Sequence, residues 1–202
     1  MNKVLSLIVL FCTLNVWAAT TFQSGDLYYK IVSDSEPYAV EVTYQTLAPN
    51  NYAELTEAEI PTTVKHDKTT YEVTGISWDA FHDYASLRSI VIPNSIQTIH
   101  YDAFNGCSAL NSIVIPNSVK RIYGEAFTGT GIYNNPSNWH NHALYIGDWL
   151  ICTNIDSISG AYNIKPSTRC IADEAFAFCE TLTSINIPNS LESIGMLSFG
   201  VC

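Results

Sequence analysis

Hydrophobic residues recur at a fixed spacing along most of the chain. The heptapeptide SIVIPNS occurs at Ser89–Ser95 and again at Ser112–Ser118, and a close copy, SINIPNS, occurs at Ser184–Ser190. Each copy belongs to a longer unit with an isoleucine and, five positions later, a phenylalanine: Ile76 and Phe81, Ile99 and Phe104, Ile122 and Phe127, Ile171 and Phe176, Ile194 and Phe199. Three of the four intervals between units are 23 residues and the other is 49. Such a period predicts a repeat solenoid, in which each unit buries its hydrophobic faces against its neighbours.

The unit from Ile99 to Arg121 predicts one short strand and one short helical turn. In its segment LNSIVIP, Ile113 and Ile115 alternate with Ser112 and Val114, which is the period of a strand with one buried face. The turn residues PNS then end the strand. The earlier segment YDAF is expected to form a short helical turn that buries its alanine and phenylalanine.

The interval of 49 residues predicts an expanded repeat rather than a domain boundary. Residues 133–160 interrupt the pattern, and LYIGDWLI within them predicts a hairpin of two short strands around Gly147 and Asp148. The pattern returns before Ile171. We therefore expect repeats over residues 76–202, with a hairpin-bearing insertion and an incomplete last repeat.

Residues 19–75 have a different pattern from the repeats. The segments DLYYKIV, YAVEVTY and TTYEVTGI are rich in Tyr and Val and predict strands. The segment IPTTV at Ile60–Val64 is similar to the IPNSV of a later unit, which indicates a degenerate first repeat. We interpret this region as a small antiparallel β cap that covers the first hydrophobic face of the solenoid.

The first 18 residues have the layout of a secretory signal peptide. Lys3 precedes a hydrophobic run from Val4 to Leu14, which is too short to span a bilayer, and small residues follow. Cleavage after Ala18 leaves 184 residues with 8 basic and 19 acidic side chains, a formal charge of 8 − 19 = −11. Because this charge repels nucleic acid and anionic lipid, neither is an expected partner.

Five cysteines remain after the signal peptide, which is an odd number for an exported chain. Cys107, Cys179 and Cys202 share one position, three residues after the phenylalanine of their units. Side chains in one such column point in parallel, which favours buried free thiols over a disulfide between Cys179 and Cys202 without excluding it. The pairing of Cys152 and Cys170 stays open.

The repeat pattern resembles the BspA-like class of bacterial leucine-rich repeats. It reads IxxxAFxxCxxLxxIxIPxSVxx and is carried here by Ile99, Ala103, Phe104, Cys107, Leu110, Ile113, Ile115, Pro116, Ser118 and Val119. The resemblance implies a leucine-rich-repeat solenoid, secreted or displayed on the cell surface, that serves adhesion or protein binding. It implies no catalytic residues, and hairpin-bearing insertions like the one expected here are familiar in this class.

The candidate binding surface is the outward row of the expected strands. Rows of this kind are rigid and pre-formed, although this one can also be read as an uncharged sheet surface without a ligand. Its members are Ser89, Val91, Ser112, Val114, Ala161, Asn163, Ser184 and Asn186.

We expect a non-catalytic protein-binding or adhesion module that contacts a host or neighbouring-cell protein. The alternative is a structural spacer, or a truncated fragment of a larger surface adhesin with no ligand of its own. We expect no enzyme activity and no cofactor, and WHNH at Trp139–His142 is more readily a solvated loop than a metal site. The hydrophobic residues from Ile187 to Phe199 also suggest end-to-end self-association, with Cys202 able to cross-link the dimers.

Export predicts a specific processed product. Mass spectrometry of secreted material should show a chain that begins at Ala19 or Thr20, because the small residues that suit signal peptidase lie there. An exported protein that retained Met1 would contradict the prediction.

Overall fold

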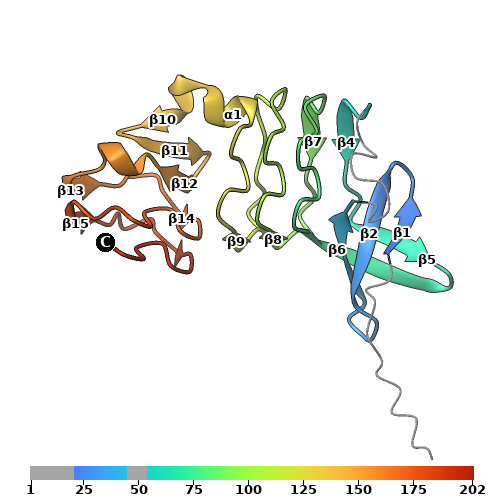
Figure 1. The fold of residues 1–202 in the computed structure, drawn as a ribbon. Coiled ribbons are helices and arrows are strands. Elements are labelled where there is room, and N and C mark those ends of the chain that lie inside the picture. Colours follow the sequence, from blue (N-terminus) through green and yellow to red (C-terminus); the bar gives the residue numbers. More distant parts are fainter. Residues whose placement is uncertain (1–20, 45–53) are drawn as a thin grey trace, which may run out of the picture.

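A computed structural model describes residues 21–44 and 54–202. The signal peptide predicted at residues 1–18 lies outside these residues. In Figure 1 the chain forms a row of coils side by side, with a β-sheet at the N-terminal end and a second group of strands at the C-terminal end. Most regular structure is short strand, and the helices of the described residues are α1 (Gly131–Asn134) and the 3-10 helices η1 (Pro136–Asn138) and η2 (Ile155–Ser157).

The N-terminal sheet consists of antiparallel strands that join the repeats through a parallel pair. Strands β1, β2 and β3 pair in chain order, β3 pairs in parallel with β6, and β5 pairs antiparallel with β6. Alternate side chains on these strands are buried, as the Tyr- and Val-rich pattern predicts. The bounds are β1 (Thr21–Ser24), β2 (Leu27–Ser33), β3 (Ala39–Thr43), β5 (Thr63–His66) and β6 (Thr69–Ile76).

The repeat period appears in the structure as a parallel ladder. The end of β6 pairs with β8 (Thr98–Ile99), which pairs with β9 (Arg121–Ile122). In this register Ile76 lies opposite Ile99, and Ile99 lies opposite Ile122, so neighbouring strands are one 23-residue unit apart. All three isoleucines are 0% exposed. The spacing in the sequence is therefore the spacing that aligns one core residue per unit.

A unit can contain two short strands, not the single strand expected. The first heptapeptide forms β7 (Ser89–Val91), which pairs in parallel with β4 (Glu57–Glu59), and β8 follows it in the same unit. The second copy, Ser112–Ser118, has the same sequence but forms no strand. At the corresponding place in the following unit the chain forms η1, which contains Pro136, so no strand follows on that side to extend the ladder.

The segments expected to be helical are hydrogen-bonded turns, so that expectation is wrong. Every unit has left-handed residues two positions before and two positions after its phenylalanine, such as Asp102 (φ 56°) and Gly106 (φ 76°) around Phe104. A left-handed residue every few positions interrupts a right-handed helix. Neighbouring turns are joined instead by backbone bonds, for example from the Phe81 N–H to the Ala103 carbonyl (2.8 Å).

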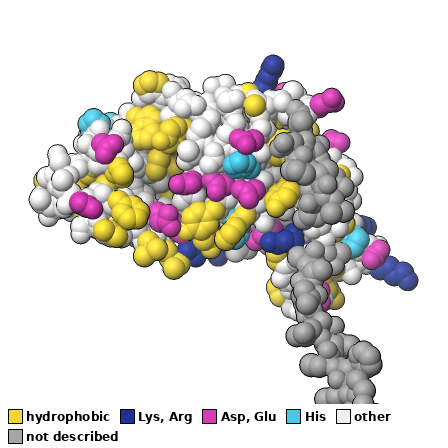
Figure 2. Space-filling model, viewed as in Figure 1, with side chains coloured by type: hydrophobic (Ala, Val, Ile, Leu, Met, Phe, Trp, Pro, Cys, Tyr) yellow, Lys and Arg dark blue, Asp and Glu magenta, His cyan; other side chains and the backbone are white. Residues whose placement is uncertain are grey.

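The position two residues before the phenylalanine is acidic in four of the five units and gives one face negative charge. Asp79, Asp102, Glu125 and Glu174 occupy it in successive units, all with φ between 54° and 60°. Figure 2 shows acidic side chains in a line across the middle of the face viewed. Their alignment follows from the stacking of the turns, which places equivalent residues of neighbouring units side by side.

The phenylalanines form stacked columns in the core. Phe81 and Phe104 have ring centroids 5.4 Å apart with 4° between the planes, and Phe104 and Phe127 are also 5.4 Å apart. A second stack, Phe176 on Phe199 with centroids 5.1 Å apart, begins after the insertion. The core is accordingly divided into two clusters of buried residues.

The insertion contains the hairpin expected around Gly147 and Asp148. Strands β10, β11 and β12 are antiparallel, and β12 pairs in parallel with β14, which pairs with β16. Leu150 lies opposite Ile171, and Ile171 lies opposite Ile194, so β12 supplies one step of a second core ladder. The bounds are β10 (Trp139–His140), β11 (Ala143–Ile146), β12 (Trp149–Thr153), β14 (Cys170–Ile171) and β16 (Ser193–Ile194).

Because neighbouring turns approach closely at Gly106 but not at Gly160, alanine substitutions at these two glycines should differ in their effect on stability. Gly106 (φ 76°) and Gly160 (φ 67°) are both left-handed, so alanine at either should lower the free energy of unfolding by about 1–2 kcal/mol. A Cβ at Gly106 would also lie 3.2 Å from the Asp83 Cα and collide with the Asp83 carboxylate, whereas one at Gly160 meets no described atom within 4 Å. Urea unfolding should show Gly106→Ala as the more destabilising change by roughly 1–3 kcal/mol. Equal losses would contradict the proposed contact between turns.

Candidate functional site

All eight residues of the predicted row are exposed in the structure. The apolar members stand out, because Val91 is 58% exposed and Val114 is 81% exposed, whereas Ile90, which precedes Val91 on β7, is 7% exposed. Adjacent side chains of a strand point to opposite faces, so Val91 lies outside because of its register on β7, and Val114 is exposed at the equivalent position of the next unit. We define the eight residues as the strand row.

The strand row is divided among two parallel ladders and one unpaired segment. Ser89 and Val91 lie on β7, whereas Ser112 and Val114 lie on the unpaired second heptapeptide. The other four residues lie on β13 (Gly160–Asn163) and β15 (Leu182–Asn186), where two pairs face each other across the parallel ladder: Ala161 with Ser184, and Asn163 with Asn186. The α1–β10 region follows the second heptapeptide in the chain and separates the two ladders in sequence.

Strand β4 adds two acidic residues to this surface, outside the eight residues of the row. Glu57 lies opposite Ser89 and Glu59 lies opposite Val91, and both are exposed. The signal was present in the chain, because EAEIP at residues 57–61 aligns with SIVIP at residues 89–93. The N-terminal edge of this surface therefore carries negative charge beside an exposed valine.

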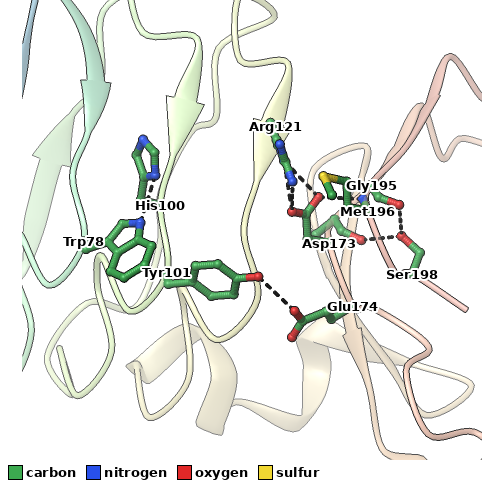
Figure 3. A network of polar contacts seen from close by, with 10 residues as sticks. Trp78, His100, Tyr101, Arg121, Asp173, Glu174, Gly195, Met196 and Ser198 are labelled. Atoms are coloured by element: carbon green, nitrogen blue, oxygen red, sulfur yellow. Dashed lines mark hydrogen bonds and ion pairs between the residues drawn. The ribbon is translucent and has the colours of Figure 1, made fainter. Parts of the chain in front are cut away.

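A second polar cluster lies in the turns where the two ladders meet (Figure 3). Arg121 donates to both carboxylate oxygens of Asp173, at 2.7 Å from Nη2 to Oδ2 and 3.2 Å from Nε to Oδ1. The Asp173 side chain is 1% exposed and also accepts the Met196 N–H at 2.9 Å. Because every oxygen of this buried carboxylate has a donor, the ion pair can stabilise the junction.

Tyr101 reaches a later repeat in the same cluster. Its hydroxyl donates to Glu174 Oε1 at 2.8 Å, and this hydrogen bond raises the pKa of Tyr101 to about 12. Gly124 lies between the two side chains, and a Cβ there would approach Glu174 Oε2 to 2.9 Å. The missing side chain of Gly124 leaves room for the contact.

Glu41 connects the N-terminal sheet to this face of the repeats. Its carboxylate lies 3.0 Å from His100 Nε2 and 3.6 Å from Lys30 Nζ, and Trp78 Nε1–H donates to the other His100 nitrogen at 3.1 Å. Burial alone would raise the pKa of Glu41, but the hydrogen bond with His100 and the charge of Lys30 leave it below its usual value. The carboxylate of Glu41 is therefore held by its contacts with His100 and Lys30, which join the N-terminal sheet to the repeats.

The five cysteines of the described residues are all unpaired. Cys107 donates its thiol to the Phe81 carbonyl at 2.9 Å, and burial raises the pKa of both Cys107 and Cys152 to about 12. Thiols held in the protonated form are poor nucleophiles. Among residues 21–44 and 54–202, no group of three or more His, Cys, Asp or Glu side chains is placed to hold a metal ion.

A group of apolar side chains near Cys202 is exposed. Ile194 is 48% exposed, Met196 is 61% exposed and Leu197 is 66% exposed. Ile194 is the second residue of β16, and Met196 and Leu197 follow this strand. The predicted end-to-end contact between copies stays a prediction, which sedimentation velocity can test.

A family model for the BspA type leucine rich repeat region matches residues 74–202, in six copies. The chain belongs to this family. The match confirms the resemblance drawn from the repeat pattern. A comparison with curated proteins finds no match.

Several solved bacterial structures have a similar fold. A leucine-rich repeat protein from Bacteroides ovatus is 23% identical with a TM-score of 0.50, and the match covers 90% of this chain and 45% of that protein. A leucine rich cell surface protein from Faecalibacterium prausnitzii is 20% identical with a TM-score of 0.49, over 90% of this chain and 46% of that protein. The T. pallidum leucine rich repeat protein is 20% identical with a TM-score of 0.48, and the match covers 90% of this chain and 67% of that protein.

The BspA-type chain spans less than half the length of the B. ovatus and F. prausnitzii proteins. At 23% identity, the B. ovatus structure shows the leucine-rich-repeat fold and nothing about a ligand. Within the part of the chain that the structure describes, no helix is both long and apolar enough to cross a membrane.

Removal of the positive charge of Arg121 should strongly destabilise the junction between the repeats. Arg121→Met should lower the free energy of unfolding by about 3–5 kcal/mol, because Asp173 would stay buried without its cation. Arg121→Met combined with Asp173→Asn should recover part of the loss, since the neutral amide oxygen can still accept the Met196 N–H. Denaturant unfolding of the three proteins tests this. A double variant no more stable than the single one would show that the unpaired charge is not the cause.

Proposed function

We propose that this chain is a secreted or cell-surface module that binds another protein through the strand row and performs no chemistry. The observation that carries the proposal is the outward register of Val91 and Val114, which are 58% and 81% exposed in equivalent positions of adjacent units. Exposed aliphatic residues on a rigid surface lose little conformational entropy when they bind, so they suit recognition of a pre-formed partner. Membership of a leucine-rich-repeat family supports the same function.

The surface has the chemistry of a protein contact with a weakly charged partner. Its other members are serine, asparagine and alanine, which supply hydrogen-bonding groups without a net charge. Glu57 and Glu59 at the β4 end favour a partner with basic residues at that end. The partner we propose is a protein on a host or neighbouring cell, and the role is adhesion.

A structural spacer is the second candidate function. The stacked units form an extended row of coils (Figure 1), which could separate two other parts of a larger surface protein without any ligand. A spacer would tolerate charge on the strand row, whereas a binding surface would not.

Replacement of both exposed valines should therefore distinguish the two functions. Val91→Glu with Val114→Glu should weaken binding to a partner by at least about ten-fold, because two carboxylates would have to be desolvated at the contact. The fold should persist, since neither side chain faces the core. Binding is measured by biolayer interferometry against purified host surface and matrix proteins, with circular dichroism as the test of folding.

Val32→Glu provides the matched control. Val32 is an exposed valine, 45% accessible, on β2 of the N-terminal sheet. The Val32→Glu variant should bind the partner with the affinity of the parent chain. If a partner bound the double variant as tightly as the parent chain, the strand row would not be the contact surface.

A further inference from the structure

The insertion forms a depression that belongs neither to the repeat core nor to the strand row. It has a volume of about 450 Å³ and is lined by Trp139, Asn141, His142 and Asn154. This volume is within the range of small-molecule sites, roughly 300–1,000 Å³. Hydrophobic side chains gather over the region of α1 and β10 on the face shown in Figure 2.

Trp139 is held in a fixed orientation beside this depression. Its indole Nε1–H donates to the Tyr133 carbonyl at 2.7 Å, and its ring meets the Tyr133 ring at 84° with centroids 5.2 Å apart. Because the only polar atom of the indole is already bonded, the ring can offer a ligand only its apolar surface. A half-buried ring held in this way is a pre-organised platform for the flat apolar face of a ligand.

The turn between β10 and β11 carries an unfavourable residue. Asn141 and His142 are its two central positions, with φ of 47° and 65°. A two-residue hairpin turn with both φ angles positive favours glycine at the second position, and histidine there is strained. The turn fixes the backbone from which the imidazole of His142 extends, so this side chain starts from a defined place beside the depression.

Asn154 completes the depression opposite the turn. Its backbone N–H donates to the His142 carbonyl at 2.8 Å, which holds the two residues together. Its exposed side chain makes no hydrogen bond within the described residues, although it directly precedes η2, where an asparagine commonly bonds to the helix. The His142 side chain likewise has no hydrogen-bond partner in that part of the chain. Both side chains are available to a ligand.

We propose that this depression binds a neutral carbohydrate. The four side chains are an indole, an imidazole and two carboxamides, and none is a carboxylate, an ammonium or a guanidinium. Amides and imidazole donate to and accept from hydroxyl groups, and the indole ring packs against the C–H face of a sugar ring. The site offers no cation to an anionic sugar, and the net charge of −10 opposes one further.

The open shape of the site limits its expected affinity. One or two sugar rings fit a depression of about 450 Å³, and few hydrogen bonds are available to them. We expect dissociation constants of about 0.1–10 mM, which are useful when many copies bind one surface. This site does not depend on the strand row, so either can be right without the other.

The test uses the intact processed chain and a panel of disaccharides. Maltose, lactose, cellobiose, mannobiose and N,N′-diacetylchitobiose are titrated with detection by saturation-transfer NMR and by calorimetry. At least one should bind in the range given above, and a glucuronic-acid disaccharide should not bind. No binding by any neutral sugar up to about 10 mM, or tighter binding of the acidic one, would overturn the proposal.

Two variants locate the binding. His142→Gly and Asn154→Ala should each weaken the affinity by about five- to ten-fold, the effect of one lost hydrogen-bonding side chain. His142→Gly should melt at the same or a higher temperature than the parent chain, because glycine suits its φ of 65°. A lost affinity in a more stable protein cannot be attributed to unfolding.

Matched controls lie far from the insertion in the sequence. His82→Ala and Asn189→Ala remove an imidazole and a carboxamide from other units, and both should bind sugar as the parent chain does. If His142→Gly and Asn154→Ala also bound as the parent chain does, the sugar would be bound elsewhere and the proposal would be wrong.

Discussion

The parallel ladder between equivalent residues of neighbouring units is the constraint on which the rest of the structure depends. It requires each unit to return to the same place with the same side chain inward, as Ile76, Ile99 and Ile122 do. Once the register is set, a residue type repeated in the sequence becomes a row in space. The stacked phenylalanines, the acidic line of the turns and the outward valines are all consequences of this one alignment.

The repeat register and its core residues could be predicted from the sequence, because both depend on the spacing of hydrophobic residues. The two strands of a unit and the turns could not be predicted as well. Asp102 and Glu125 are left-handed because the backbones of neighbouring turns impose that conformation. Neither residue type is specific enough to predict a positive φ from the sequence. The second heptapeptide shows the same limit, since it repeats the sequence of the segment that contains β7 but forms no strand.

The candidate sites differ in how far the sequence could indicate them. The outward position of Val91 and Val114 follows from the alternation of buried and exposed positions in the sequence, and this pattern was sufficient even though Val114 does not lie on a strand. The depression beside Trp139 depends on a turn conformation and on Asn154, which lies 12 residues after His142. The ion pair of Arg121 with Asp173 joins residues 52 positions apart, across an insertion of irregular length. No local pattern could have joined them.

That ion pair also determines where the array can change in length. A unit added between Ile76 and Ile99 would extend a ladder of equivalent steps and leave the contacts of Arg121 with Asp173 and of Tyr101 with Glu174 as they are, but it would move His100 one strand spacing away from Glu41. A unit added between Ile122 and Ile171 would separate Arg121 from Asp173 by about one strand spacing, 4.8 Å, and would also pull Tyr101 away from Glu174. Side-chain contacts thus fix the number of units between Tyr101 and Glu174, and the contact of Glu41 with His100 fixes the number between the N-terminal sheet and this junction.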